Sequence, residues 1–579
     1  MDDVATSPPR KKRRIPKACS ACRRSKVRCD EKRPCTRCVQ SATTCTWHEK
    51  LEVSVDERLE RVEHAVWALI LPTGTSAGTD ALAQRKASVE SCGACQTREP
   101  LCRDVVSSGS VSEGEAEAWF ATFFRGCDRF VPIFDPKLDS YASVRRRDSI
   151  LFDVLVIYGC RAATGSLSQA YQILYHLIRQ HTSDLILQDS VYSLERVQAL
   201  LVIASYSDSG AVLCDISLRE SKRMGLPSRL STLLSTLAGN IGSPSQTGDH
   251  DLTLFTSART WYGLFVLDQI LSLDGGKPPS MSLHASSRRV CALIAHPCRT
   301  PLDLRLFAQV ELNEIRASSY ASLRLAATAG EQTLKEAIDG GLLDLSMWHT
   351  EWQVIVNENL PAGEDITVFV VNISIQHAWA VLTLQLRALT ASGVENIALM
   401  TEPQRLIASA AKAAAERHLD LLLTSVHAVS SPDAPTQQPP SDRPYIASFR
   451  YAMEFVWAKN AFCVLIVLRL AFLLGDALPA ITQRLQQARD FLAELSKVGM
   501  GANSSYTRIL SQTIRKCQRA VDASMQAQDI TQPQRDPGDE DFSTFVPQEF
   551  LFEWSFPGLN LCYIPLDWQD LFLDFGATE

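Results

Sequence analysis

Six cysteines near the N-terminus are the residues of this chain best placed to do chemistry. Their spacing is C-x2-C-x6-C-x5-C-x2-C-x6-C, which is one unit written twice. A Cys-x2-Cys turn places two thiolates around one ion, and zinc takes four ligands in tetrahedral geometry. Two such sites need eight ligand positions, which four terminal thiolates and two bridging thiolates supply when each bridge is counted twice. The spacing therefore predicts two zinc ions held by Cys19, Cys22, Cys29, Cys35, Cys38 and Cys45.

Two mononuclear sites use part of the same spacing. In the first, Cys29 and Cys45 are not ligands, and the zinc ion is bound by four cysteines: Cys19, Cys22, Cys35 and Cys38. The other takes one histidine: Cys35, Cys38, Cys45 and His48. Both discard the repeat, so the binuclear site is favoured, with a single zinc ion as the alternative.

The two halves of the cluster differ in charge. The segment between Cys22 and Cys29 reads RRSKVR and has four cations, whereas the segment between Cys38 and Cys45 reads VQSATT and has none. A short helix whose two ends are fixed by metal ligands holds its cations rigidly. We therefore expect the first half to face a polyanion.

These residues resemble the DNA-binding domain of the fungal binuclear zinc cluster (Zn2Cys6) transcription factors. All six ligand positions match, and Pro34 stands in the loop that joins the halves. The resemblance implies that Cys19 and Cys35 bridge the two metals, and that Lys26 reads a CGG-type triplet in the major groove of double-stranded DNA. A lysine there can reach the O6 and N7 acceptors of guanine. Phosphate contacts, which set register without reading sequence, are expected from Arg23, Arg24, Arg28, Lys32 and Arg37.

The charge of the chain is strongly polarised. The whole chain of 579 residues has a net charge of −7, yet residues 1–50 hold 14 Lys/Arg against 5 Asp/Glu, a net of +9. Residues 536–579 hold 10 Asp/Glu and no Lys or Arg. The first end fits a nucleic-acid-binding module and the second an acidic interaction tail. No apolar stretch follows the first positive charges, so we expect no secretory signal and a reducing compartment.

Residues 1–18 are predicted to be a basic arm. Their compact run of cations suits a nuclear localisation signal, a phosphate-contacting arm, or both, and places the protein in the nucleus. The run consists of Arg10, Lys11, Lys12, Arg13 and Arg14.

Between the cluster (19–45) and the body, two segments are expected. Residues 46–71 form a linker and a short coiled coil, because apolar residues recur at a and d positions over about two heptads. These are Val55, Leu59, Val62, Val66 and Leu69. They predict a homodimer on DNA, or else an amphipathic helix docked on the body. Residues 72–114, rich in Gly, Ser and Thr, are predicted to be a flexible linker. Its Cys92, Cys95 and Cys102 are expected to be reduced thiols, with metal binding or redox sensing as the alternative.

Residues 115–525 are predicted to be a large all-α domain. Apolar residues recur at intervals of three and four, with loops expected at 227–251 and 430–444. The longest apolar run, 461–475, is interrupted by Arg469 and is too short to span a bilayer, so we expect a buried core helix and no membrane partner. No Gly-rich phosphate loop, nucleophile elbow or His-Glu-x-x-His occurs, which argues against an enzyme. Histidines such as His176, His181 and His377 are read as surface or core residues.

Three stretches of this middle region resemble the regulatory middle homology region of the same family: 116–134, 196–226 and 258–280. The resemblance implies a domain that restrains activity and in some members binds a small-molecule effector. Within it, Arg259 and Trp261 are expected to be structural, on an amphipathic helix with a local charge network that includes Asp268 and Lys277.

Residues 536–579 combine acids with ten aromatic residues, as in DWQDLFLDF. Repulsion keeps such a segment extended and its aromatics accessible, so it suits an activation tail that recruits coactivator machinery. The alternative is a tail packed on the helical body. The sequence thus predicts a small zinc cluster domain, an all-α regulatory domain, and disordered linkers and tail. The function expected is a nuclear, sequence-specific transcriptional activator; a DNA-binding repressor or scaffold, and then an enzyme with an appended zinc module, are the alternatives.

Overall fold

The computed structural model describes residues 35–41, 104–187, 193–207, 209–239, 249–274, 279–283, 292–361, 366–394, 400–426, 443–498 and 504–530. The chain divides into two compact units, residues 1–99 and 100–579. In the first unit, the described part is one short helix, α2 (Thr36–Gln40), with the residue on either side of it.

The second unit is all-α over its described residues, as predicted, apart from one two-residue ladder. Its first helices are α4 (Glu113–Gly126), the 3-10 turn η1 (Cys127–Arg129), α5 (Tyr141–Arg147), α6 (Ser149–Thr164), α7 (Gln169–Leu187), α8 (Leu194–Tyr206), α9 (Gly210–Arg223) and α10 (Leu226–Gly239). The longer ones follow: α11 (Asp249–Leu273), α13 (Pro301–Ala326), α14 (Glu331–Asn359), α15 (Ile366–Ala391), α16 (Glu402–Leu423), η3 (Tyr445–Tyr451), α17 (Glu454–Leu473), α18 (Leu478–Val498) and α19 (Ser504–Ile530).

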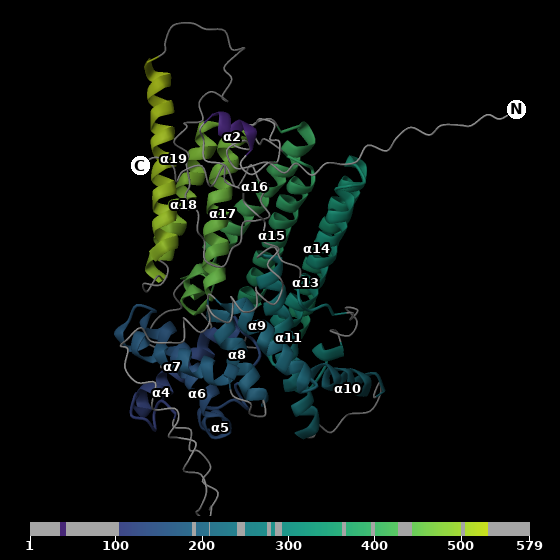
Figure 1. Cartoon of the computed structure of the whole chain (residues 1–579), viewed down its shortest axis with the longest axis vertical. Coiled ribbons are helices and arrows are strands. Elements are labelled where there is room, and N and C mark those ends of the chain that lie inside the picture. Colours follow the sequence, from purple (N-terminus) through teal and green to yellow (C-terminus); the bar gives the residue numbers. More distant parts are fainter. Residues whose placement is uncertain are drawn as a thin grey trace, which may run out of the picture. The chain divides into compact units, whose positions relative to one another are not determined.

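Helices that follow one another in the chain also pack on one another. Each helix from α13 to α16 packs on the helix that follows it in the chain, up to α17, and α19 packs on both α17 and α18. These long helices stand next to each other in Figure 1. Helices α4 to α9 form a second group, and α11 joins the groups by packing on α9 and α13. The ladder pairs β1 (Ser425–Val426) antiparallel with β2 (Arg443–Pro444) beside η3.

Local signals in the sequence explain several helix ends. Ser112 and Glu115 form a capping box at the start of α4, with the Ser112 N–H donating to a Glu115 carboxylate oxygen at 3.1 Å. Helix α6 begins where the Asp148 carboxylate accepts the Leu151 N–H at 2.8 Å, and it ends at Gly165, whose φ of 92° suits glycine. Such caps satisfy backbone groups that a helix end leaves unpaired.

Two hydrophobic cores lie within this unit. The first is built mainly by α4 to α14, and the second by α15 to α19. In the first core α4 and α6 cross so closely that a Cβ on Gly159 would lie 1.9 Å from the backbone oxygen of Trp119. A glycine is therefore required at this crossing.

The structure corrects two predicted boundaries. The expected loop 227–251 contains helix α10, whose Leu230 and Leu233 are buried; Pro227 fits because the first turn of a helix needs no N–H at that position. The end of the predicted flexible linker is packed, since Val105 is buried and its N–H donates to Asp153 Oδ1 at 2.8 Å.

Two described helices, Ile366–Ala391 and Phe455–Leu473, are long and apolar enough to cross a membrane by length and composition. Half of the first and 83% of the second are buried inside the protein. The second holds most of the apolar run 461–475, so this run is a buried core helix, as predicted.

Candidate functional site

Two of the six predicted zinc ligands lie in the described residues. Cys35 immediately precedes α2 and Cys38 lies in its first turn; their exposed fractions are 0% and 3%. The Cys38 N–H donates to Cys35 Sγ at 3.4 Å, and the Val39 N–H donates to the Cys35 carbonyl at 3.1 Å. The backbone thus turns Cys35 toward the start of α2, the helix that bears Cys38.

This turn fits a metal thiolate site. Neither Cys35 nor Cys38 is in a disulfide, and a backbone N–H directed at sulfur favours the charged thiolate, which is the form that binds zinc. Within the described residues no group of three or more His, Cys, Asp and Glu side chains is arranged to hold a metal ion. The other ligands proposed for this site lie outside those residues: Cys19, Cys22, Cys29 and Cys45.

Most of the predicted DNA contacts also lie outside the described residues. Arg37 is within α2, and the structure does not describe the other five: Lys26, Arg23, Arg24, Arg28 and Lys32. Three predicted segments also lie outside the described residues: the basic run 10–14, the coiled coil at 55–69 and the tail 536–579. The same holds for the linker cysteines Cys92, Cys95 and Cys102. Their roles remain predictions.

Arg259 of α11 is structural, but its partner is not local. Its guanidinium forms a two-pronged ion pair with Asp303 of α13, with Nε at 2.7 Å from Oδ1 and Nη2 at 2.8 Å from Oδ2, and both residues are fully buried. Asp268 instead accepts the backbone N–H groups of Ser280 and Met281, and Lys277 is not described. Asp268 is therefore not a partner of Arg259, contrary to expectation, and the expected role of Lys277 stays a prediction. The helix is not amphipathic here either, because residues 257–269 are all buried.

A second buried charge cluster links α11, α13 and α17. Asp274 lies 2.5 Å from Arg316 Nη2 and 2.5 Å from Lys459 Nζ, and it accepts the indole N–H of Trp379 at 3.2 Å. Burial alone would raise the pKa of Asp274, but the two cations outweigh burial and hold it at about 2. Both cations thus share one carboxylate, which ties the three helices together.

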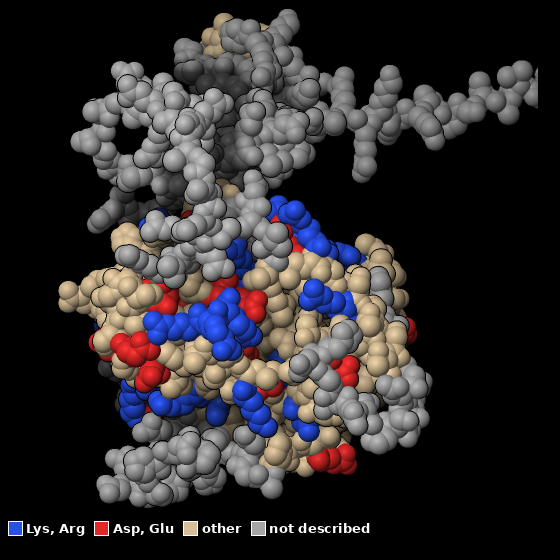
Figure 2. Space-filling view, turned by 90° about the horizontal axis from the view of Figure 1, so that it is seen from below, with Lys and Arg blue, Asp and Glu red and all other residues tan. Residues whose placement is uncertain are grey.

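The described basic side chains near α5 lie next to acidic ones. Figure 2 views the end of the unit that bears α4, α5 and α10 in Figure 1, and there basic and acidic side chains are interspersed. Arg145 pairs with Asp104 and Glu113, and Arg147 pairs with Asp139. Paired cations of this kind have little attraction left for phosphate, in contrast to the +9 segment at residues 1–50.

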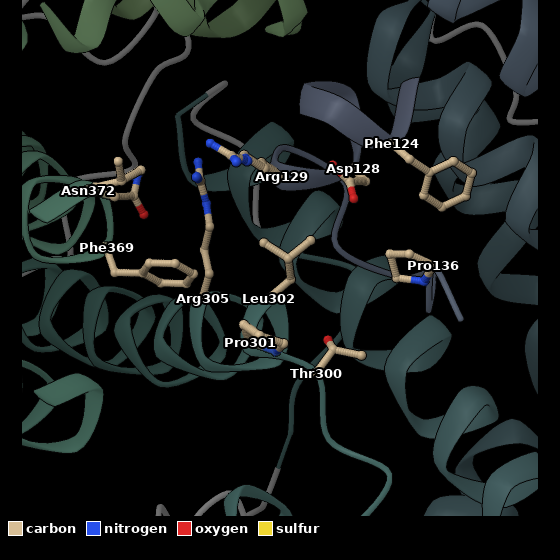
Figure 3. Close-up of a pocket in the computed structure, with 11 residues that line it drawn as sticks. Phe124, Asp128, Arg129, Pro136, Thr300, Pro301, Leu302, Arg305, Phe369 and Asn372 are labelled. Atoms are coloured by element: carbon tan, nitrogen blue, oxygen red, sulfur yellow. The ribbon is translucent and has the colours of Figure 1, made fainter. Parts of the chain in front are cut away.

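Sequence reasoning missed a cavity of about 190 Å³ between α4 with η1, α13 and α15 (Figure 3). Its polar side chains include Asp128 and Arg129 of η1 and Arg305 of α13. Burial raises the pKa of Asp128 to about 7, against the opposing effect of Arg129 and Arg305. No motif marks these residues, because segments more than 170 positions apart come together only in the folded unit.

A neighbouring cavity shares Arg305 and Asn372 with the first but has most of its polar groups paired. His418 Nε2 lies 2.8 Å from Asn460 Oδ1, and Asn372 donates to the Tyr445 hydroxyl at 2.8 Å. Burial lowers the pKa of His418 to about 4, against the opposing effect of its contacts with Asn460 and the Ile375 carbonyl, so the imidazole is neutral near pH 7.

The histidines noted in the sequence fit surface or core roles. His176 is exposed, and His181 contacts the buried Asp153 at 2.9 Å. His377 stacks on His349 with ring centroids 4.5 Å apart, and burial lowers its pKa to about 4.

Comparison with known proteins identifies the N-terminal segment. Residues 17–54 match the family model of the fungal Zn(2)-Cys(6) binuclear cluster domain. The chain is 65% identical over 40 residues to transcription factor opdR of Penicillium oxalicum, which is 7% of this chain and 5% of that protein. It is 27% identical over 263 residues to the transcriptional activator of proteases prtT of Emericella nidulans, which is 44% of this chain and 36% of that protein. The chain thus spans about a third or less of the length of either relative. No solved structure matches.

Proposed function

Residues 17–54 belong to the fungal Zn(2)-Cys(6) binuclear cluster domain family, and from this premise we propose that the chain is a nuclear, sequence-specific DNA-binding transcription factor. A domain of this family binds two zinc ions. The match carries the proposal, because the matched stretch contains six cysteines and nine Lys and Arg residues. Both relatives are regulators of transcription by name, which supports a regulator rather than an enzyme.

All six cysteines of the matched stretch are proposed as the ligands, two zinc ions sharing two of them. The buried Cys35-x2-Cys38 turn supports this assignment for the second half of the repeat. Because the ligand thiolates come together only in the folded domain, we expect zinc binding and folding of this segment to be one event.

Lys26 is proposed to read the base edges of a CGG-type triplet, with Arg24 and its neighbours on phosphate. A good base contact is worth about 1–3 kcal/mol of discrimination against the wrong base. A phosphate contact contributes affinity for every sequence and about one unit to the salt dependence.

A binding selection with the full zinc-loaded chain and random DNA tests this assignment. Lys26→Ala should flatten the preference for the triplet. Arg24→Ala, the matched control, should weaken binding to all sequences alike and reduce the salt slope by about one. If Lys26→Ala keeps its triplet preference while Arg24→Ala loses it, the two roles are assigned the wrong way round.

The segment at 55–69 is proposed to pair two copies on DNA. A dimer would place two clusters on two triplets and double the number of base contacts. Replacing Leu59 with Asp puts a charge in the seam, and sedimentation of the DNA complex should then show one chain per DNA instead of two. Asp substitution of Glu60, outside the seam, is the control.

The tail 536–579 is proposed to activate transcription by binding coactivator proteins through its aromatic residues. Fusing it to an unrelated DNA-binding domain should switch on a reporter. A second fusion with Phe572 and Phe575 replaced by Ala keeps every acid and should lose most of the signal. A silent wild-type fusion would favour the repressor reading.

A further inference from the structure

We propose that the cavity between η1, α13 and α15 binds a small organic carboxylate with an apolar body about the size of a benzene ring. The inference concerns binding by the helical unit and does not rest on the proposed DNA-binding function. Three observations carry it: unpaired positive charge, a neighbouring carboxyl group that does not neutralise that charge, and the size of the apolar walls.

Two guanidinium groups reach this cavity without an acidic partner. Arg305 is only 9% exposed and its Nε has no hydrogen-bond partner, while its Cζ lies 5.2 Å from the centroid of the Phe130 ring. Within the described chain, neither Arg305 nor the half-buried Arg129 forms a hydrogen bond or an ion pair through its side chain. Figure 3 shows both side chains extending to the same end of the cavity. A buried cation without a partner is costly, so an anion there would be stabilised by both.

Asp128 supplies a carboxyl group to the wall but leaves the positive charge largely uncompensated. It is 3% exposed, and its Oδ1 has no hydrogen-bond partner. No ion pair joins it to Arg129 or Arg305 among the described residues. Burial raises its pKa to about 7, so at neutral pH a large fraction is protonated and can donate an O–H to a ligand oxygen. A carboxylate that accepts from two guanidiniums and one O–H would satisfy all three groups.

The remaining walls set the size and polarity of the ligand. Phe124, Leu302 and Phe369 contribute apolar surface, and Figure 3 shows them around the centre and sides of the cavity. A cavity of about 150 Å³ is enough to hold benzene. The volume of about 190 Å³ therefore fits one ring with a carboxylate attached. The neighbouring cavity is a weaker candidate, because Asn372, His418 and Lys459 in its wall already have partners.

Isothermal titration of the full zinc-loaded chain at pH 6.5, where Asp128 is mostly protonated, with benzoate tests the proposal. Benzamide has the same ring without the charge and is the matched ligand control; inorganic phosphate tests for a general anion site. Benzoate should bind at one site per chain and at least tenfold more tightly than either. Arg129→Gln, at a half-buried position that tolerates the change, should weaken benzoate binding at least tenfold, and Arg324→Gln, an exposed arginine of α13, should leave it unchanged.

Asp128→Asn distinguishes loss of the site from loss of the fold. At pH 8 this substitution removes negative charge beside the ligand, so benzoate should bind at least threefold more tightly, which a misfolded variant cannot do. Absence of benzoate binding, equal binding of benzamide or phosphate, or a full response in Arg129→Gln would each overturn the proposal.

Discussion

The ion pair between Arg259 and Asp303 makes the helical unit vulnerable to a change of one atom. Asp303→Asn replaces a carboxylate oxygen with an amide nitrogen and keeps nearly the same shape. Arg259 is then left with a full charge at an exposed fraction of 1%. Its other contacts, a hydrogen bond from Nη2 to the Cys298 carbonyl at 3.2 Å and the Phe255 ring at 5.0 Å, are neutral groups, and Asp135 and Asp139 act on it without an ion-pair contact.

The size of the effect follows from this geometry. Removing one partner of a buried ion pair costs about 3–5 kcal/mol, because the other charge stays desolvated. The cap of α13 contributes little to the loss: Asp303 Oδ2 accepts the Thr300 N–H at 2.7 Å, and asparagine keeps one carbonyl oxygen for that role. We therefore expect the free energy of unfolding of the helical unit to fall by about 3–5 kcal/mol.

Urea unfolding of the full chain, followed by tryptophan fluorescence and circular dichroism, measures this change. Asp339→Asn on exposed α14 is the matched control and should shift the transition by less than about 0.5 kcal/mol. The double variant Arg259→Met with Asp303→Asn has no unpaired charge and should recover part of the lost stability. A loss under about 1 kcal/mol for Asp303→Asn, or a double variant less stable than the single one, would refute the reasoning.

Three further predictions concern metal, packing and pH. Zinc released by mercurial titration should equal two ions per chain, whereas Cys29→Ser should lower that number and abolish DNA binding; one ion in the wild type would favour a mononuclear site. Gly159→Ala should destabilise the first core by about 3 kcal/mol or more, because its Cβ would meet the Trp119 backbone oxygen, and Gly340→Ala, in open space on α14, should not. Burial lowers the pKa of His418 in the folded protein to about 4, compared with 6.5 in the unfolded chain. The neutral imidazole therefore contributes stability above pH 6.5, and this stability is lost as the pH falls from 6.5 toward 4. In His418→Gln, the free energy of unfolding should depend less on pH over that range.

The helical nature of the middle region could be read from periodicity, and the errors have physical causes. The loop expected at 227–251 is wrong over 227–239, because the leucines at 230, 233, 234 and 237 have helical spacing and Pro227 stands in a first turn, where it is tolerated. The sequence predicts an amphipathic helix for α11, but residues 257–269 are buried on all sides. Burial on all sides depends on how many other helices pack around a helix. That number is set by packing and not by the helix's own sequence.

The sequence by itself determined the zinc cluster, because metal coordination depends on ligand type and on spacings of a few residues, which are properties of local chain geometry. It also determined the charge polarity between residues 1–50 and 536–579. Only the tertiary structure decided the partner of Arg259, 44 positions along the chain, and the joining of Asp128, Arg129 and Arg305 in one cavity. Such contacts arise from helix packing in three dimensions, and a one-dimensional pattern carries no signal for which distant side chains will be buried together.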